Sequence, residues 1–126
     1  MKLRTRTNSI RLRLTRGEVS RLASTGSVEE SIFVGPSEGD VLTHALRTSG
    51  DATRLSARLD GRMLVITVPL AEARAWAESD AVSLTAEQPA LGGRTLTILV
   101  EKDFACLTKR NEDDSDAFPN PNETCR

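Results

Sequence analysis

Five basic side chains near the N-terminus are the strongest candidates for a binding function: Lys2, Arg4, Arg6, Arg11 and Arg13. The first three alternate along one segment and the last two along the next. Alternate residues of a β-strand point to the same face. A hairpin of these segments would present five cations on one surface if both sets face outward. Such a surface can neutralise phosphates, and arginine adds bidentate contacts.

The charge distribution leaves two other readings of these cations open. Residues 1–25 carry a net charge of +6, residues 26–100 carry −4 and residues 101–126 carry −3. In the first reading, the basic strands form an ordinary solvated face, or one that pairs with Glu29, Glu30 or the acidic C-terminal segment. Alternatively, the acidic C-terminal segment covers the basic hairpin within one molecule, and removal of residues 103–126 would then raise heparin affinity.

A second candidate site lies near the C-terminus, where Asp103, Cys106 and Cys125 could bind zinc together with His44 or the acidic run 112–116. The two cysteines are not in a Cys-x-x-Cys pair, and the chain has one histidine. A disulfide or thiol switch is the first alternative, and a buried Cys106 with a free Cys125 is the second. The acidic run has neither the glycine nor the twelfth-position glutamate of an EF-hand calcium loop.

Catalytic motifs are absent from the sequence. There is no phosphate-binding P-loop, no Gly-x-Gly-x-x-Gly, no nucleophile elbow and no tyrosine. The single histidine, His44, falls on the apolar face of a predicted strand and is expected to be a hydrogen-bonded core residue. We therefore expect a protein that is not an enzyme.

The elements that would position these residues repeat with an offset of 54. Apolar residues alternate in 10–14 and again in 63–68, and each segment is followed by a short helix, predicted over 15–23 and 70–79. Thr15 and Glu18 form a capping-box pattern before the first helix. Pro69 stands at the start of the second, in which Trp76 is expected to anchor the core.

Further strands are expected over 2–6, 27–34, 41–48, 54–59, 81–86 and 95–102. The order is therefore ββαββ, twice. Repeat 1 covers 1–48 and repeat 2 covers 54–101, so residues 1–102 form one duplicated β-barrel domain. Residues 103–126 read as an acidic, irregular tail. The second hairpin lacks the basic face, because Val65 and Thr67 replace Arg11 and Arg13.

This unit resembles the AbrB-type ββαββ unit, in which two chains form a swapped-hairpin, cradle-loop barrel. The resemblance implies a mainly β fold, a pseudo-twofold barrel of eight strands in one chain, and DNA binding by analogy. In addition, NSIRLRLTRGEV (residues 8–19) with VEKDFACL and DAFPNPN nearer the C-terminus resembles a small bacterial protein family of unknown function.

The sequence therefore predicts a small non-enzymatic binding or regulatory protein. Its expected partner is nucleic acid or another polyanion at the N-terminal hairpin, and a metal- or thiol-dependent module is the alternative. No apolar run of signal-peptide or membrane-spanning length is present, so a cytoplasmic location with reduced cysteines is expected. The duplication favours a monomer, and a homodimer is the alternative.

Overall fold

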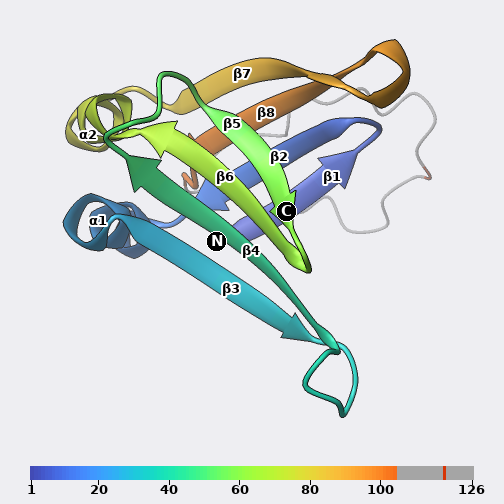
Figure 1. The fold of residues 1–126 in the computed structure, drawn as a ribbon. Coiled ribbons are helices and arrows are strands. Elements are labelled where there is room, and N and C mark those ends of the chain that lie inside the picture. The colour runs from blue at the N-terminus through green and yellow to red at the C-terminus, as the bar shows by residue number, and fades with distance from the viewer. Residues whose placement is uncertain (105–117, 119–126) are drawn as a thin grey trace.

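A computed structural model describes residues 1–104 and 118. The described chain is mainly β, as the sequence predicts, and Figure 1 shows both helices at one end of the sheets. The elements are β1 (Lys2–Arg6), β2 (Ser9–Leu14), α1 (Arg16–Thr25), β3 (Ser27–Phe33), β4 (Val41–Ser49), β5 (Ser56–Asp60), β6 (Met63–Pro69), α2 (Leu70–Glu78), β7 (Ser83–Ala90), the 3-10 turn η1 (Leu91–Gly93) and β8 (Arg94–Lys102).

Each of the two four-stranded sheets combines one hairpin from each half of the chain. The strand orders are β1-β2-β8-β7 and β3-β4-β6-β5, and the two central pairs, β2–β8 and β4–β6, are parallel. Ile10 pairs with Ile98 in the first sheet, and Leu64 pairs with His44 in the second. Leu64 lies 54 positions after Ile10, and Ile98 lies 54 positions after His44. The predicted offset therefore reappears in the strand registers.

The predicted closed barrel is not confirmed, because neither described sheet closes on itself. Side chains bridge the seams between the sheets instead. At the β5–β7 seam the Gln88 amide donates to the Ala57 carbonyl at 2.8 Å and accepts from its N–H at 2.9 Å. At the other seam the Met1 ammonium contacts Glu30 of β3. Polar side chains thus connect edge strands whose backbones do not pair.

Both helices start where the sequence predicts. Thr15 and Glu18 form a complete capping box at α1, and Gly26 ends this helix with a φ of 83°. Pro69 occupies the N-cap position of α2. Leu22 of α1 and Trp76 of α2 are buried, and they join a core of alternating strand residues: Ile10, Leu12, Leu14, Val28, Leu46, Ile66, Val68, Ile98 and Val100.

The expected strand over 81–86 is wrong at both ends. β7 begins at Ser83 and runs through Pro89 to Ala90, so it starts two residues later and ends four residues later than expected. Proline is tolerated there because β7 is an edge strand. The offset of 54 also changes locally. Val28 pairs with Leu46, and Leu84 pairs with Val100, which is the counterpart of Leu46. Leu84, and not Val82, is therefore the counterpart of Val28.

The β3–β4 hairpin projects away from the sheets beyond β6, as Figure 1 shows. Among the helices of the described chain, none has the length and apolar character needed to cross a membrane.

Candidate functional site

The strand register brings all five predicted basic residues onto one outward face of the β1–β2 hairpin, here called the basic ribbon. Lys2 lies opposite Arg13, and Arg4 lies opposite Arg11. Arg6 lies opposite Ser9 on the same face. The other face carries Leu12 and Leu14, which are fully buried, so the core fixes which side the cations occupy.

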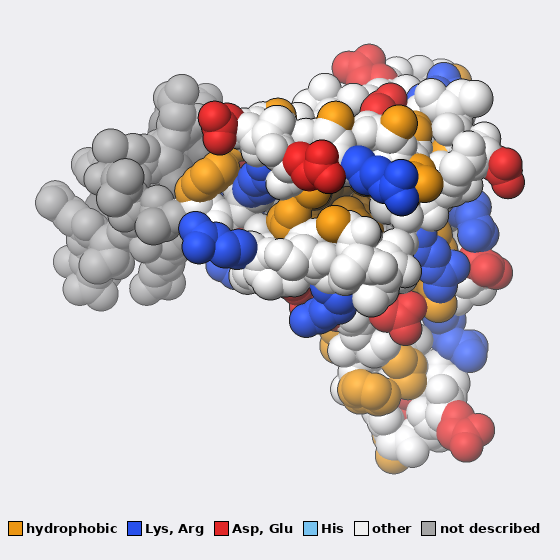
Figure 2. Space-filling model, turned by 90° about the vertical axis from the view of Figure 1, so that its left-hand side faces the viewer, with side chains coloured by type: hydrophobic (Ala, Val, Ile, Leu, Met, Phe, Trp, Pro, Cys, Tyr) orange, Lys and Arg blue, Asp and Glu red, His pale blue; other side chains and the backbone are white. Residues whose placement is uncertain are grey.

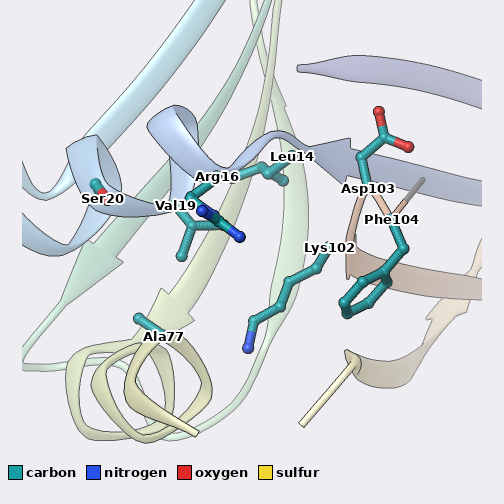
Figure 3. A pocket seen from close by; sticks show the side chains of 8 residues that line it. All are labelled: Leu14, Arg16, Val19, Ser20, Ala77, Lys102, Asp103 and Phe104. Atoms are coloured by element: carbon teal, nitrogen blue, oxygen red, sulfur yellow. The ribbon is translucent and has the colours of Figure 1, made fainter. Parts of the chain in front are cut away.

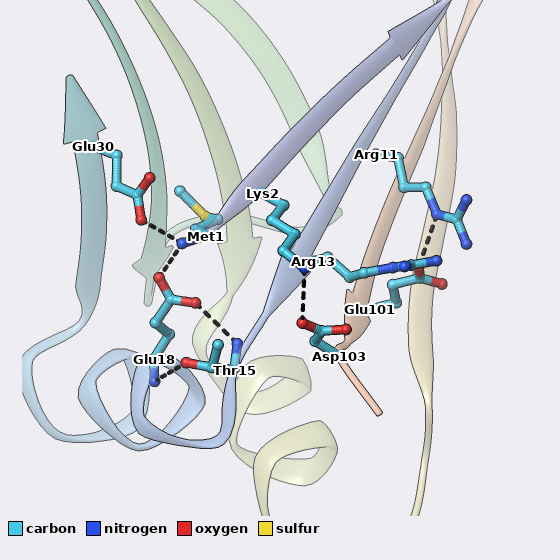
Figure 4. Close-up of polar contacts among 9 residues, drawn as sticks. All are labelled: Met1, Lys2, Arg11, Arg13, Thr15, Glu18, Glu30, Glu101 and Asp103. Carbon is cyan, nitrogen blue, oxygen red and sulfur yellow. Dashed lines mark hydrogen bonds and ion pairs between the residues drawn. The ribbon is translucent and has the colours of Figure 1, made fainter. Parts of the chain in front are cut away.

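A single carboxylate holds the inner two cations of the basic ribbon. The Nε groups of Arg11 and Arg13 both donate to Oε1 of Glu101, each at 2.7 Å (Figure 4). Glu101 stands on β8 directly beside Arg13. Burial raises the pKa of Glu101, but the hydrogen bonds and charges of Arg13 and Arg11 outweigh this effect and lower it below its usual value. Both guanidinium groups are thereby fixed at the sheet surface.

The three cations of β1 are more exposed than those of β2. The Lys2 side chain is 74% exposed, against 30% for Arg11 and 22% for Arg13. Lys2 pairs with Asp103, whose carboxylate lies 3.4 Å from Nζ (Figure 4). Arg4 and Arg6 are also exposed. The basic ribbon therefore has an ordered inner row and a solvent-facing outer row.

This arrangement has an energetic cost. Like charges directly opposite each other on neighbouring strands are destabilising, and the Lys2–Arg13 and Arg4–Arg11 pairs are of this kind. The carboxylates of Glu101 and Asp103 offset part of this repulsion. The corresponding face of the β5–β6 hairpin carries Arg58 and Asp60, which form an ion pair at 3.6 Å. The same ladder therefore forms without the repulsive pairs.

A second polar cluster, which the sequence did not predict, lies at the N-terminus (Figure 4). The Met1 ammonium donates to the carboxylates of Glu18 and Glu30. Burial lowers the pKa of this ammonium, but the two carboxylates outweigh it and raise the pKa. Glu18 also accepts from the Thr15 N–H at 2.9 Å. Burial raises the pKa of Glu18, but its hydrogen bonds to Met1 and Thr15 lower it overall.

His44 is a buried core residue, as predicted. Its Nε2 lies 3.4 Å from the Met1 carbonyl oxygen, and only the tautomer with a proton on Nε2 can donate this hydrogen bond. Its Nδ1 has no partner among the described residues. The capping-box pattern pointed to Glu18, but only the three-dimensional fold brings Met1 beside Glu18 and His44 beside Met1.

The predicted metal or thiol site cannot be assembled from the described residues. Asp103 pairs with Lys2, while Cys106, Cys125 and the acidic run 112–116 lie outside the described chain. Within the described ranges no group of three or more His, Cys, Asp or Glu side chains could hold a metal ion. The zinc and thiol alternatives, and the covering of the hairpin by the acidic segment, stay predictions.

Exposed apolar side chains gather at the projecting end of the β3–β4 hairpin. The exposed fractions are 52% for Ile32, 77% for Phe33, 74% for Val34 and 45% for Leu42. Leu59, at the end of β5, is 76% exposed. Ile32 and Leu42 lie opposite each other on one face of the hairpin, and Phe33 lies on the other face. Exposed apolar side chains gathered in this way are typical of a protein contact site.

Comparison with known proteins gives a family but no annotated relative. No curated protein matches the chain, and no solved structure matches it. A family model described as a family of unknown function (DUF7009) matches residues 1–122, and the chain belongs to this family.

Proposed function

We propose that the basic ribbon binds the phosphate backbone of nucleic acid. The observation that carries this proposal is the set of opposed like charges, Lys2 with Arg13 and Arg4 with Arg11, on an outward sheet face. Glu101 and Asp103 offset part of the repulsion within these pairs, and the matching hairpin does without the pairs. A bound polyanion would place negative charge between these cations and reduce their repulsion. Binding would also release the counterions held by the phosphates.

Neighbouring side chains are suited to the same ligand. Thr97 of β8 stands on the outward face with the cations, beside Ser9 of β2, whose own hydroxyl donates to the Arg6 carbonyl at 2.6 Å. Thr95 and Thr85 are exposed on the adjoining strands. Hydroxyl groups commonly donate to phosphate oxygens and orient a backbone without reading its sequence. The resemblance to the AbrB-type unit supports DNA as the polyanion by analogy.

The test is the binding of a fluorescein-labelled 20-base-pair DNA duplex, followed by anisotropy across a potassium chloride series. We expect log K to fall linearly with log salt, with a slope of about −0.9 for each phosphate neutralised. The triple variant Lys2→Gln/Arg4→Gln/Arg6→Gln should bind about tenfold more weakly and with a shallower slope.

The matched control removes three exposed arginines from elsewhere on the surface: Arg58→Gln/Arg62→Gln/Arg74→Gln. It makes the same change in net charge but leaves the basic ribbon intact. Equal losses in the two triple variants would show that net charge alone attracts DNA and would contradict the proposal. If the first variant keeps its DNA affinity but aggregates, the cations protect β1, which is an edge strand, from edge-to-edge pairing.

A second candidate function, protein contact, is favoured by the exposed apolar end of the β3–β4 hairpin. β3 is an edge strand, so its outer backbone can pair with another strand. We propose a second copy of the chain as the occupant, joined edge to edge. Sedimentation velocity should then show a dimer that the Phe33→Ser/Val34→Ser variant loses, and a wild-type monomer at high concentration would contradict this.

A further inference from the structure

A pocket of about 290 Å³ lies between the two helices, at the end of the molecule opposite the projecting hairpin. Its apolar wall comes from Leu14, Val19, Ala77 and Phe104, and its cations are Arg16 and Lys102. Figure 3 shows Arg16 and Lys102 extending from opposite sides toward the space beside Val19 and Ala77. Figure 2, which views this end, shows cationic side chains next to exposed apolar ones.

Two contacts fix the position of the Lys102 ammonium. Its Nζ donates to the Ser79 carbonyl at 2.7 Å and lies 5.5 Å from the centre of the Trp76 ring. An ammonium has three donors, so this contact leaves donor capacity for a ligand. Asp103 also lines the pocket, but its charge is balanced by Lys2 outside it.

Arg16 is the second cation and is exposed at the first turn of α1. No ion pair of its guanidinium is found within the described chain, and it is not needed for the capping box, which Thr15 and Glu18 make. Its side chain lies along the pocket and not against the core. A structural role for Arg16 therefore has no support from its contacts.

The two halves of the chain differ at these positions. By the offset of 54, Arg16 corresponds to Leu70 and Lys102 corresponds to Thr48. The same backbone framework thus accommodates a leucine and a threonine where the pocket has two cations. Both cations line the same pocket although they lie 86 positions apart in the sequence.

We infer that this pocket binds a small organic anion, namely a carboxylate or phosphate ester on a short apolar body. The cations would hold the anionic group, and the apolar wall would cover the hydrocarbon part. The volume is at the lower end for ligand pockets, about 300 Å³, which restricts the ligand to a few carbons beyond its charged group. This site lies apart from the basic ribbon and does not depend on nucleic-acid binding.

The test is an NMR titration of the full chain with hexanoate and with hexyl phosphate, using hexan-1-ol as the neutral control. Trp76 is the only tryptophan, so its indole N–H gives one signal, and Lys102 lies beside its ring. We expect saturable shifts of this signal with a Kd of about 1 mM for at least one anion. The anion that binds more tightly identifies the charged group.

The decisive variants replace each cation by the residue of the other half. Arg16→Leu and Lys102→Thr should each weaken anion binding about tenfold and leave hexan-1-ol unchanged. Arg21→Leu removes the same charge from an exposed position of α1 outside the pocket lining and should have little effect. Arg16→Lys should retain part of the affinity, because it keeps the charge.

Three results would overturn the inference. The first is the absence of saturable shifts with either anion by about 10 mM. The second is binding of hexan-1-ol as tightly as of the anions. The third is an equal loss of affinity in Arg16→Leu and Arg21→Leu, because net charge and not the pocket would then attract the ligand. An Arg6→Gln variant, which alters the basic ribbon and keeps the Lys2–Asp103 pair, should leave hexyl phosphate affinity within about twofold.

Discussion

The β1–β2 and β5–β6 hairpins have equivalent registers and different outer faces. In β1–β2 the outward residues include Lys2, Arg4, Arg6, Arg11 and Arg13, with Glu101 of β8 as a shared partner. In β5–β6 the corresponding positions carry one pair of opposite charges, together with serine, threonine, valine and methionine. Both hairpins bury an equivalent apolar face.

This comparison separates the side chains that the hairpin fold requires from those that it does not require. A hairpin at this place in the sheet requires an inward row of apolar residues and a tight turn, and both hairpins have these. Five outward cations are not required, since β5–β6 forms the same ladder without them. The two halves also differ at Glu18, which is buried in α1, whereas its counterpart Glu72 is exposed in α2.

The largest expected effect is at this glutamate pair. Glu18→Ala removes the carboxylate that completes the capping box and contacts the Met1 ammonium, leaving a buried charge with one partner fewer. We expect a loss of about 3 kcal/mol in the free energy of unfolding, measured with urea. Glu72→Ala should change it by less than about 0.5 kcal/mol. Similar losses in both variants would contradict the different roles of the two residues.

A smaller effect is expected at the carboxylate of the basic ribbon. Glu101→Gln leaves Arg11 and Arg13, both half-buried, next to Lys2 and Arg4 without their shared anion. We expect a loss of about 2 kcal/mol in unfolding free energy. DNA affinity should rise, because a negative charge leaves the binding face.

The control for this variant is Asp60→Asn on the other hairpin. Asp60 is 68% exposed and its partner Arg58 is 57% exposed, so the change should cost less than about 0.5 kcal/mol. A fall in DNA affinity for Glu101→Gln would mean that the carboxylate orders the arginines for binding more than it neutralises them.

The pH dependence follows from the same carboxylate. The pKa of Glu101 is lowered from 4.5 in the folded state. Its stabilisation is therefore complete above pH 4.5 and is lost as the pH falls through the lower folded-state pKa. The urea midpoint of the wild type should fall on acidification below pH 4.5, and that of Glu101→Gln should fall less steeply. Parallel curves would assign the acid sensitivity to other carboxylates, among them Glu18.

Much of the fold could be predicted because local signals agreed with it. Alternating apolar residues, the Thr15–Glu18 capping box and Gly26 placed most elements to within a few residues. The extension of β7 through Pro89 could not, because only the fold shows that β7 is an edge strand. The closed barrel was expected from resemblance, and the two described sheets remain separate.

The candidate site was predictable only in part, for a similar reason. The alternation in β1 and β2 named all five cations, and the register determined that they share a face. Glu101 was missed because it is 88 positions from Arg13 and becomes its neighbour only through the parallel β2–β8 pairing. The pocket beside Arg16 was missed for the same reason, since Lys102 reaches it from the end of β8.

The smallest expected effect comes from copying the outer row of the basic ribbon onto the second hairpin. Ser56→Lys/Asp60→Arg, with the native Arg58, reproduces on β5 the cations of Lys2, Arg4 and Arg6. The neighbouring strand would still carry Val65 and Thr67 and no ordered arginines. If the inner row fixed by Glu101 matters, DNA affinity should rise less than about threefold and the salt slope should change by less than one phosphate equivalent. A gain as large as the loss caused by removing the native three cations would show that three exposed charges on any edge strand suffice.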